Sequence, residues 1–131
     1  MDIINSKNYV DKAEAVIDKL IQGAEKTKPP LLTTSQIRNQ LSMTSELQAR
    51  VETTLYSTDL LSDEIIGEIE NLRVQFIYQA GREASVKKFV EEANIKEILK
   101  SIGSNKADFL LFCRYMEALV AYRKYRRPDK N

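Results

Sequence analysis

The side chains that could perform catalysis in this chain of 131 residues are mainly acids, because it has no histidine and only one cysteine. Histidine is the usual general base and the commonest metal ligand, so most hydrolase chemistry lacks its central group. Paired carboxylates can divide acid and base roles, or hold Mg²⁺, when one cleft collects them. The acids form two groups: Asp59, Asp63, Glu64, Glu68 and Glu70, and then Glu91 and Glu92. Because these positions fall at predicted helix starts and on solvent faces, we interpret them as capping and solubilising residues.

The most apolar stretch of the chain contains the single cysteine, Cys113, between Phe109 and Met116. We interpret this thiol as a small core residue, and alone it cannot form an intramolecular disulfide. Arg114 and Glu117 lie three residues apart in the same stretch, so we favour an ion pair on one helix face over contact with a ligand. The sequence has no phosphate-binding loop of the form GxxxxGK[ST]. We therefore expect no enzymatic activity, no metal site and no cofactor.

Basic side chains remain as candidates for contact with the backbone of a nucleic acid. Arginine can bind phosphate with two parallel hydrogen bonds, and lysine supplies a mobile point charge. The candidates are Arg38, Arg73, Arg82, Lys87 and Lys88. From their spacing alone, ordinary solvated charge is the better explanation.

Arg73 and Arg82 are nine residues apart, which places them on opposite sides of a continuous helix at about 100° per residue. They can face one ligand only if the chain turns at Gly81. We therefore predict that Gly81 ends the helix in the left-handed conformation. In that case Gly81→Val should cost about 1 kcal/mol or more and misdirect Arg82.

Charge is distributed unevenly along the chain, although the net charge is only +1. Residues 1–70 contain 7 Lys and Arg against 12 Asp and Glu, whereas residues 71–131 contain 13 against 7. This asymmetry suits a protein with one face toward a polyanion and another toward protein neighbours, and it also occurs on ordinary solvated surfaces.

The longest apolar runs have five residues, far below the roughly 18 of a membrane span. The first residues resemble no secretory signal, so a cytoplasmic protein without membrane contact is expected.

Apolar residues recur at spacings of three and four almost throughout, which predicts an all-α fold. We expect a single domain over residues 1–131, a compact bundle of five to six helices with a long buried C-terminal helix. The predicted helices cover residues 6–26, 33–56, 62–81, 85–93, 95–102 and 104–126. The start signals are a capping box of Thr33 with Gln36, then Ser62, then Ser85, and finally Ser104 or Asn105. Asn94 and Gly103 should separate the short helices.

The last predicted helix is apolar on most of its circumference, as expected for a helix surrounded by others. Its central core residues should be Phe109, Phe112, Met116, Leu119 and Val120. Residues 123–131 are predicted to form a polar, basic tail. On the second helix, the residues next to Arg38 are small, so the backbone of a partner could approach closely there: Ser42, Ser45 and Ala49.

Three segments resemble the small subunit of type III-A CRISPR effector (Csm) complexes: TSQIRN at 34–39, LRVQFIYQAGRE at 72–83 and FLLFCRYMEALVAY at 109–122. The resemblance covers about residues 33–125, the family-like core. Residues 1–30 match only as a variable N-terminal helix and connector. The resemblance implies an all-helical, non-catalytic protein that stacks in several copies beside the backbone subunits and helps to hold the target RNA. Cleavage activities then belong to the backbone and large subunits.

The resemblance also implies site residues and partners. Arg38 and Asn39 match its first segment and Arg73 and Arg82 its second, and we extend the role to Lys87 and Lys88 by charge and proximity. The implied partners are target RNA, the crRNA–target duplex, backbone and large subunits, and neighbouring copies of the chain. Contacts to phosphate and ribose would not depend on base sequence. A protein–protein adaptor without RNA contact remains an alternative, and a small enzyme would need a convergent polar pocket that the sequence does not indicate.

Overall fold

A computed structural model describes residues 3–26 and 29–127. The regular secondary structure of the described residues is entirely α-helical, apart from one isolated bridge between Leu60 and Asn105. The helices are α1 (Tyr9–Lys26), α2 (Thr34–Thr54), α3 (Asp63–Arg82), α4 (Ala84–Glu92), α5 (Ile95–Ser101) and α6 (Lys106–Arg126). The predicted fold class is confirmed.

The start signals of three helices are confirmed at atomic detail. At α2, the Thr33 hydroxyl accepts the Gln36 backbone N–H at 3.0 Å, and the Gln36 side chain accepts the Thr33 N–H at 2.8 Å. Ser62 accepts the Ile65 N–H at 3.2 Å before α3. At α6, Asn105 rather than Ser104 is the cap, because its side chain accepts the Asp108 N–H at 3.0 Å.

The short helices begin and end at sharp changes in backbone direction. Asn94 and Gly103 have φ values of 56° and 57°, which confirms both predicted breaks. The prediction that Ser85 caps α4 is wrong. Glu83 occupies that position with an extended backbone and no capping side-chain bond, because the Ser85 hydroxyl donates to Gln36 on α2 instead.

The predicted turn at Gly81 is wrong, because α3 runs through Gly81 to Arg82. Of the glycines in the described ranges, only Gly103 has a positive φ. The chain leaves the helix at Glu83, whose N–H donates to the Gln79 carbonyl at 3.1 Å. Arg73 and Arg82 therefore lie on opposite sides of one helix and do not converge on a single ligand.

Gly81 can consequently be replaced with a gain in stability. A Cβ at Gly81 would have no heavy atom within 4 Å, and its helical backbone suits alanine. Gly81→Ala should raise the free energy of unfolding by about 0.5–1 kcal/mol, measured by urea denaturation. Gly103→Ala is the matched control, because a Cβ there meets equally open space but a φ of +57°. It should lower stability by about 1 kcal/mol, and a destabilised Gly81→Ala would restore the original prediction.

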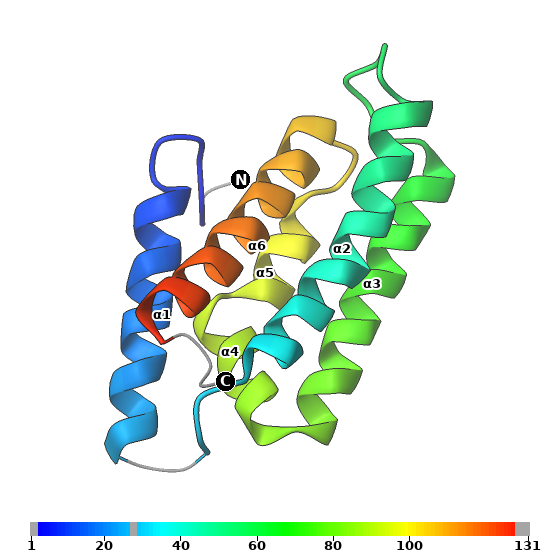
Figure 1. The fold of residues 1–131 in the computed structure, drawn as a ribbon. Helices are drawn as coiled ribbons and strands as arrows, with labels where there is room; N and C mark the ends of the chain where they lie inside the picture. The colour runs from blue at the N-terminus through cyan, green and yellow to red at the C-terminus, as the bar shows by residue number, and fades with distance from the viewer. Residues whose placement is uncertain (1–2, 27–28, 128–131) are drawn as a thin grey trace.

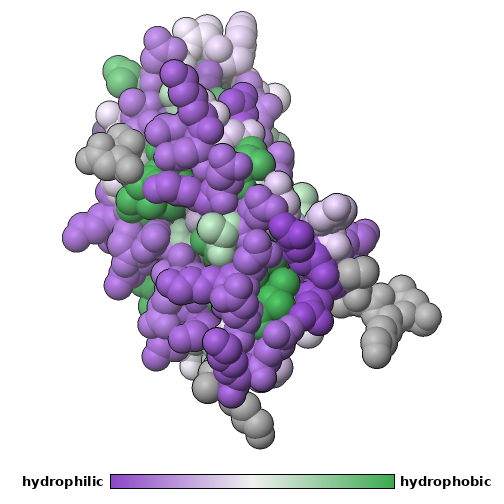
Figure 2. Space-filling view, turned by 90° about the vertical axis from the view of Figure 1, so that its left-hand side faces the viewer, coloured by the Kyte–Doolittle hydropathy of each residue, from purple (hydrophilic) through white to green (hydrophobic). Residues whose placement is uncertain are grey.

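Helix α6 lies between α1 and α2, and α3 packs on the far side of α2 (Figure 1). Helices α4 and α5 lie behind this row, against α3, with further contacts from α4 to α1 and from α5 to α6. No helix in the described ranges is both long and apolar enough to cross a membrane. Figure 2 shows the α1 side of the molecule as mainly hydrophilic, with small separate hydrophobic areas.

The core gathers around α6, as predicted. Phe109, Phe112, Met116 and Leu119 are all completely buried, whereas Val120 is only partly buried. The rings of Phe112 and Phe76 on α3 meet edge to face, with centroids 6.3 Å apart and planes at 89°.

Arg123 lies in α6, as the predicted helix over 104–126 requires, but it is only 6% exposed and so is not part of a solvated basic tail. Residues 128–131 of that predicted tail lie outside the described residues. The Nε of Arg123 donates to the Leu32 carbonyl at 2.7 Å. This bond attaches the segment that precedes α2 to the end of α6.

Candidate functional site

The Gln36 side chain joins the start of α2 to the corner between α3 and α4. Its Nε2 donates to Glu83 Oε2 at 2.5 Å, and its Oε1 accepts the Ser85 hydroxyl at 3.2 Å as well as the Thr33 N–H. Glu83 and Ser85 lie 47 and 49 residues from Gln36 along the chain. The sequence indicated only the local capping role of Gln36, because nothing local identifies the distant partners.

Arg38 and Asn39 follow Gln36 directly and are exposed on α2. Neither forms an ion pair with any residue in the described ranges. The small side chains predicted beside Arg38 are exposed too, namely Ser42, Ser45 and Ala49. This face of α2 is therefore open, and no acid among the described residues neutralises the charge of Arg38.

Arg82 is exposed at the end of α3, next to the corner that Gln36 holds. Its Cζ lies 5.6 Å from the ring centroid of Tyr78, a cation–π contact within one helix. In the part of the chain that the structure describes, Arg82 has no acidic partner. Arg38, Asn39 and Arg82 thus gather at one end of the molecule.

Arg73 differs from Arg82 in both position and charge balance. Its side chain is 25% exposed and its Nη2 lies 2.8 Å from Glu70 Oε2 on the preceding turn. Its side chain is therefore half-buried, and the carboxylate of Glu70 offsets its positive charge. Arg73 therefore stands apart from the Arg38, Asn39 and Arg82 group.

Lys87 and Lys88 are both exposed on α4 but border different hollows. Lys88 lies beside the hollow between α1 and α4, where Lys19 forms an ion pair with Glu92 at 3.3 Å. Lys87 borders the hollow between α3 and α5, next to Ile77. The structure does not bring the two lysines to one point.

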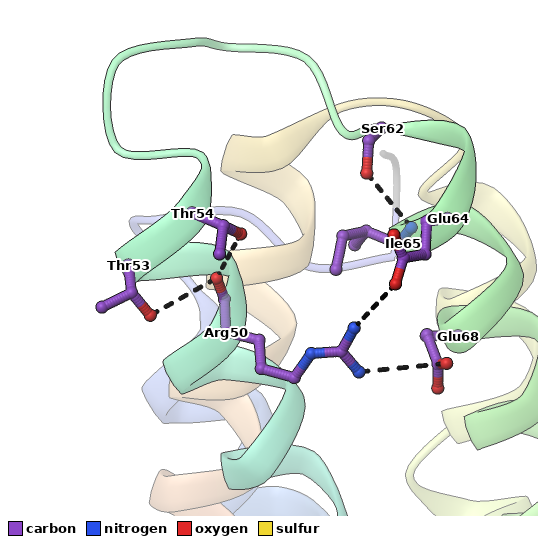
Figure 3. Close-up of polar contacts among 7 residues, drawn as sticks. All are labelled: Arg50, Thr53, Thr54, Ser62, Glu64, Ile65 and Glu68. Carbon is purple, nitrogen blue, oxygen red and sulfur yellow. Dashed lines mark hydrogen bonds and ion pairs between the residues drawn. The ribbon is translucent and has the colours of Figure 1, made fainter.

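The first predicted group of acids lies toward the opposite end, around the start of α3, whereas Glu91 and Glu92 lie at the end of α4. Asp63 and Glu64 lie in its first turn. Arg50 reaches across from α2 to Glu64 at 3.2 Å and to Glu68 at 3.9 Å (Figure 3). Among the residues that the structure describes, no three acids or cysteines are grouped as a metal site would need. The α2–α3 pair is therefore acidic at one end and basic at the other.

The arginines after Arg123 are not free positive charges. Arg126 pairs with Glu14 and with Asp18, the latter at 3.2 Å, and Arg127 pairs with Glu25, all on α1. Sequence reasoning missed these pairs, because their partners are 102 and 112 residues away in the two hydrogen-bonded cases. The basic excess of the second half of the chain is therefore partly neutralised by the acidic first half.

The predicted ion pair of Arg114 with Glu117 is absent from the described residues. Both side chains are exposed, where such a pair gains only a few tenths of a kcal/mol, about what ordering two long side chains costs. Arg114 instead borders a shallow groove between α2 and α6, beside Gln48 and Tyr56.

Two buried ionisable groups on α6 stay protonated in the fold. The pKa of the Cys113 thiol is raised far above its usual range, mainly by burial. The negative charges of Glu117 and Glu52 raise this pKa further. Burial also raises the pKa of Tyr115, with a smaller contribution from Glu92. The Tyr115 hydroxyl donates to the Ala93 carbonyl at 2.9 Å. The prediction that Cys113 is a core residue is confirmed.

These raised pKa values predict a loss of stability in alkali. In the unfolded chain the two groups regain pKa values of about 8.5 and about 10, so above these values the unfolded state binds fewer protons than the folded one. The free energy of unfolding should be unaffected below about pH 8, then fall by up to about 1.4 kcal/mol per pH unit per group. Urea denaturation from pH 7 to 11 measures this. Tyr115→Phe with Cys113→Ala should flatten the alkaline slope, and an unchanged slope would contradict the assignment.

Comparison with known proteins identifies the family. The family model for Csm2 Type III-A matches residues 10–129. A CRISPR system Cms protein Csm2 from Streptococcus thermophilus is 48% identical over 125 residues, covering 95% of this chain and 96% of that protein. The Csm2 protein of Mycobacterium tuberculosis H37Rv is 42% identical over 122 residues, covering 92% and 93%. That of Enterococcus italicus is 40% identical over 100 residues, covering 73% and 69%.

The resemblance drawn from the three sequence segments is confirmed by these matches, which extend it over α1 as well. The variable N-terminal extension expected from sequence therefore lies mostly within the matched region, from residue 10 onward. The chain belongs to the Csm2 family of type III-A CRISPR systems.

Proposed function

We propose that this chain is a non-catalytic small subunit of a type III-A CRISPR effector complex and that it contacts target RNA within the crRNA–target duplex. In this proposal several copies stack beside the backbone and large subunits. The observation that supports RNA contact best is the group of Arg38, Asn39 and Arg82, which are exposed at one end of the molecule. Within the described ranges, neither of the two arginines pairs with an acid. The arginines of the C-terminal turn are paired with α1 acids by contrast.

The proposed mechanism is recognition of the RNA backbone. Arginine binds phosphate oxygens and asparagine can hydrogen-bond ribose hydroxyls, so neither contact requires a particular base. Lys87 and Lys88 flank the corner between α3 and α4 and would add long-range attraction. Because net charge is only +1, an isolated copy should bind RNA weakly. Stacked copies would multiply weak contacts through effective concentration.

The test compares assembled complexes that carry Arg38→Ala with Arg82→Ala against complexes that carry Arg73→Ala. The double variant should bind complementary target RNA more weakly, and the slope of log affinity against log salt should fall by roughly 0.7 per lost phosphate contact. Arg73→Ala should have a smaller effect, since Glu70 already offsets its charge. The loss should be the same for unrelated target sequences with matching guides.

The alternative is a helical adaptor that binds only other subunits. Unchanged affinity and salt slope in intact complexes of the double variant would favour it. Purified free protein should cleave no RNA with or without Mg²⁺, and metal-dependent cleavage by this protein would refute the non-catalytic role.

A further inference from the structure

A strip of exposed side chains runs along α3 on the side toward α2. It consists of Asn71, Gln75, Tyr78 and Arg82, which are spaced four, three and four residues apart and therefore lie on one face of the helix. Asn71 and Gln75 also line the polar groove between α3 and α2, together with Arg50. Two amides, one aromatic ring and one guanidinium thus follow each other in a line.

Tyr78 is the aromatic member and is unusually open, with 61% of the residue exposed. Its ring is held beside the Arg82 guanidinium, with 5.6 Å from Cζ to the ring centroid. The contact restricts the rotamers of both side chains before any ligand arrives, which reduces the entropy lost on binding. Val74, one turn earlier, is also 61% exposed and extends the apolar surface beside the ring.

The chain contains a second aromatic and arginine pair that provides a comparison. Tyr125 is 76% exposed, and Arg126 Cζ lies 5.8 Å from its ring centroid. Arg126 is engaged by Glu14 and Asp18, however, so this pair presents carboxylates that would repel phosphate. Arg82 has no acidic partner in the described residues. Of these two pairs, the Tyr78 pair alone combines an open ring with a guanidinium that no described acid compensates.

We propose that Tyr78 stacks on an unpaired nucleobase of the bound RNA while Arg82 holds the adjoining phosphate. An aromatic face tolerates any base, because every base has a π-face, and a nearby guanidinium adds to the stack. The amides of Asn71 and Gln75 can donate to and accept from base edges or the ribose 2′-hydroxyl. Asn71, Gln75 and Arg82 place hydrogen-bond donors and acceptors on the same helix face as the ring, as recognition of a nucleotide requires. This inference rests on the proposed function and assigns its ligand as a nucleotide outside a base-paired stack.

The experiment uses assembled complexes and target RNA whose guide-complementary segment has unpaired flanks, with 5-iodouracil at successive positions of the whole strand. Irradiation should cross-link Tyr78 to one or a few positions per copy. Tyr78→Leu should abolish the cross-link and weaken RNA binding by about 5- to 150-fold without changing the salt slope, because no phosphate contact is lost. Tyr78→Phe should retain affinity, since the ring remains. Tyr125→Leu is the matched control and should bind as the unmodified complex does.

The outcomes of these variants distinguish a failure of base stacking by Tyr78 from a failure of the proposed function. If Arg38→Ala with Arg82→Ala weakens binding but Tyr78→Leu does not, the proposed function stands and base stacking is overturned. If Tyr78→Leu prevents the other subunits from co-purifying, the strip is a protein interface and stacking is likewise overturned. A loss of affinity in Tyr78→Leu that Tyr78→Phe restores, in complexes of full composition, supports stacking.

Discussion

Phe112→Ala should lower the free energy of unfolding by about 3–5 kcal/mol. Phe112 is completely buried near the middle of α6, and its ring meets the edge of Phe76 from α3. Helix α6 lies between α1 and α2, so the surrounding helices can only partly close the cavity that alanine would leave. Both the lost apolar burial and the unfilled volume contribute.

Urea denaturation followed by far-ultraviolet circular dichroism measures this loss. Phe112→Leu is the control, because it keeps most of the volume and should cost less than about 1.5 kcal/mol. A loss below 1 kcal/mol, roughly that of one methylene, in Phe112→Ala would show that the α6 core is not packed as described.

Arg123→Met should lower the free energy of unfolding by about 2–3 kcal/mol, although it replaces a charged residue by an apolar one of similar length. The Arg123 Nε donates to the Leu32 carbonyl at 2.7 Å, and Nη1 donates to the Arg127 carbonyl. Without the guanidinium, the Leu32 carbonyl loses a charged donor in a buried place.

The exposed neighbour provides the control, since Lys124→Met should change stability by no more than about 0.5 kcal/mol. Leu32 precedes the Thr33 cap of α2. We therefore expect faster amide hydrogen exchange at the start of α2 in Arg123→Met, at Ile37 in particular. Equal stability and exchange in both variants would show that the bond to Leu32 contributes nothing.

Arg38 and Arg82 are kept at one end of the described fold by contacts from other elements. The hydrogen bond from Arg123 to Leu32 holds the segment before α2, and the bond from Gln36 to Glu83 holds the first turn of α2. These contacts come from α6 and from the α3–α4 corner respectively. The positions of the candidate RNA contacts therefore depend on bonds between segments that are 47 and 91 residues apart in the chain.

Local features of the sequence were sufficient to predict the fold class and most helix boundaries. The Thr33 capping box, the Ser62 and Asn105 caps and the breaks at Asn94 and Gly103 act within one turn of helix. The period of apolar residues likewise predicted that α6 is the central helix. Such features require no knowledge of distant partners, because their energies come from neighbours in the chain.

Tertiary contacts decided where the charges lie. Glycine is a residue type that commonly ends helices, yet α3 continues through Gly81 and the chain turns at Glu83. Hydrogen bonds of Gln36 with Glu83 and Ser85 hold the chain at this turn. Arg126 was predicted to end the last helix within a polar, basic stretch, but it pairs with acids of α1. The sequence alone was thus sufficient to identify the charged residues and the segments that form helices. Whether Arg126 and Arg127 remain uncompensated depended on partners 112 and 102 residues away, because an ion pair or a buried hydrogen bond forms only when packing brings both groups within a few ångströms.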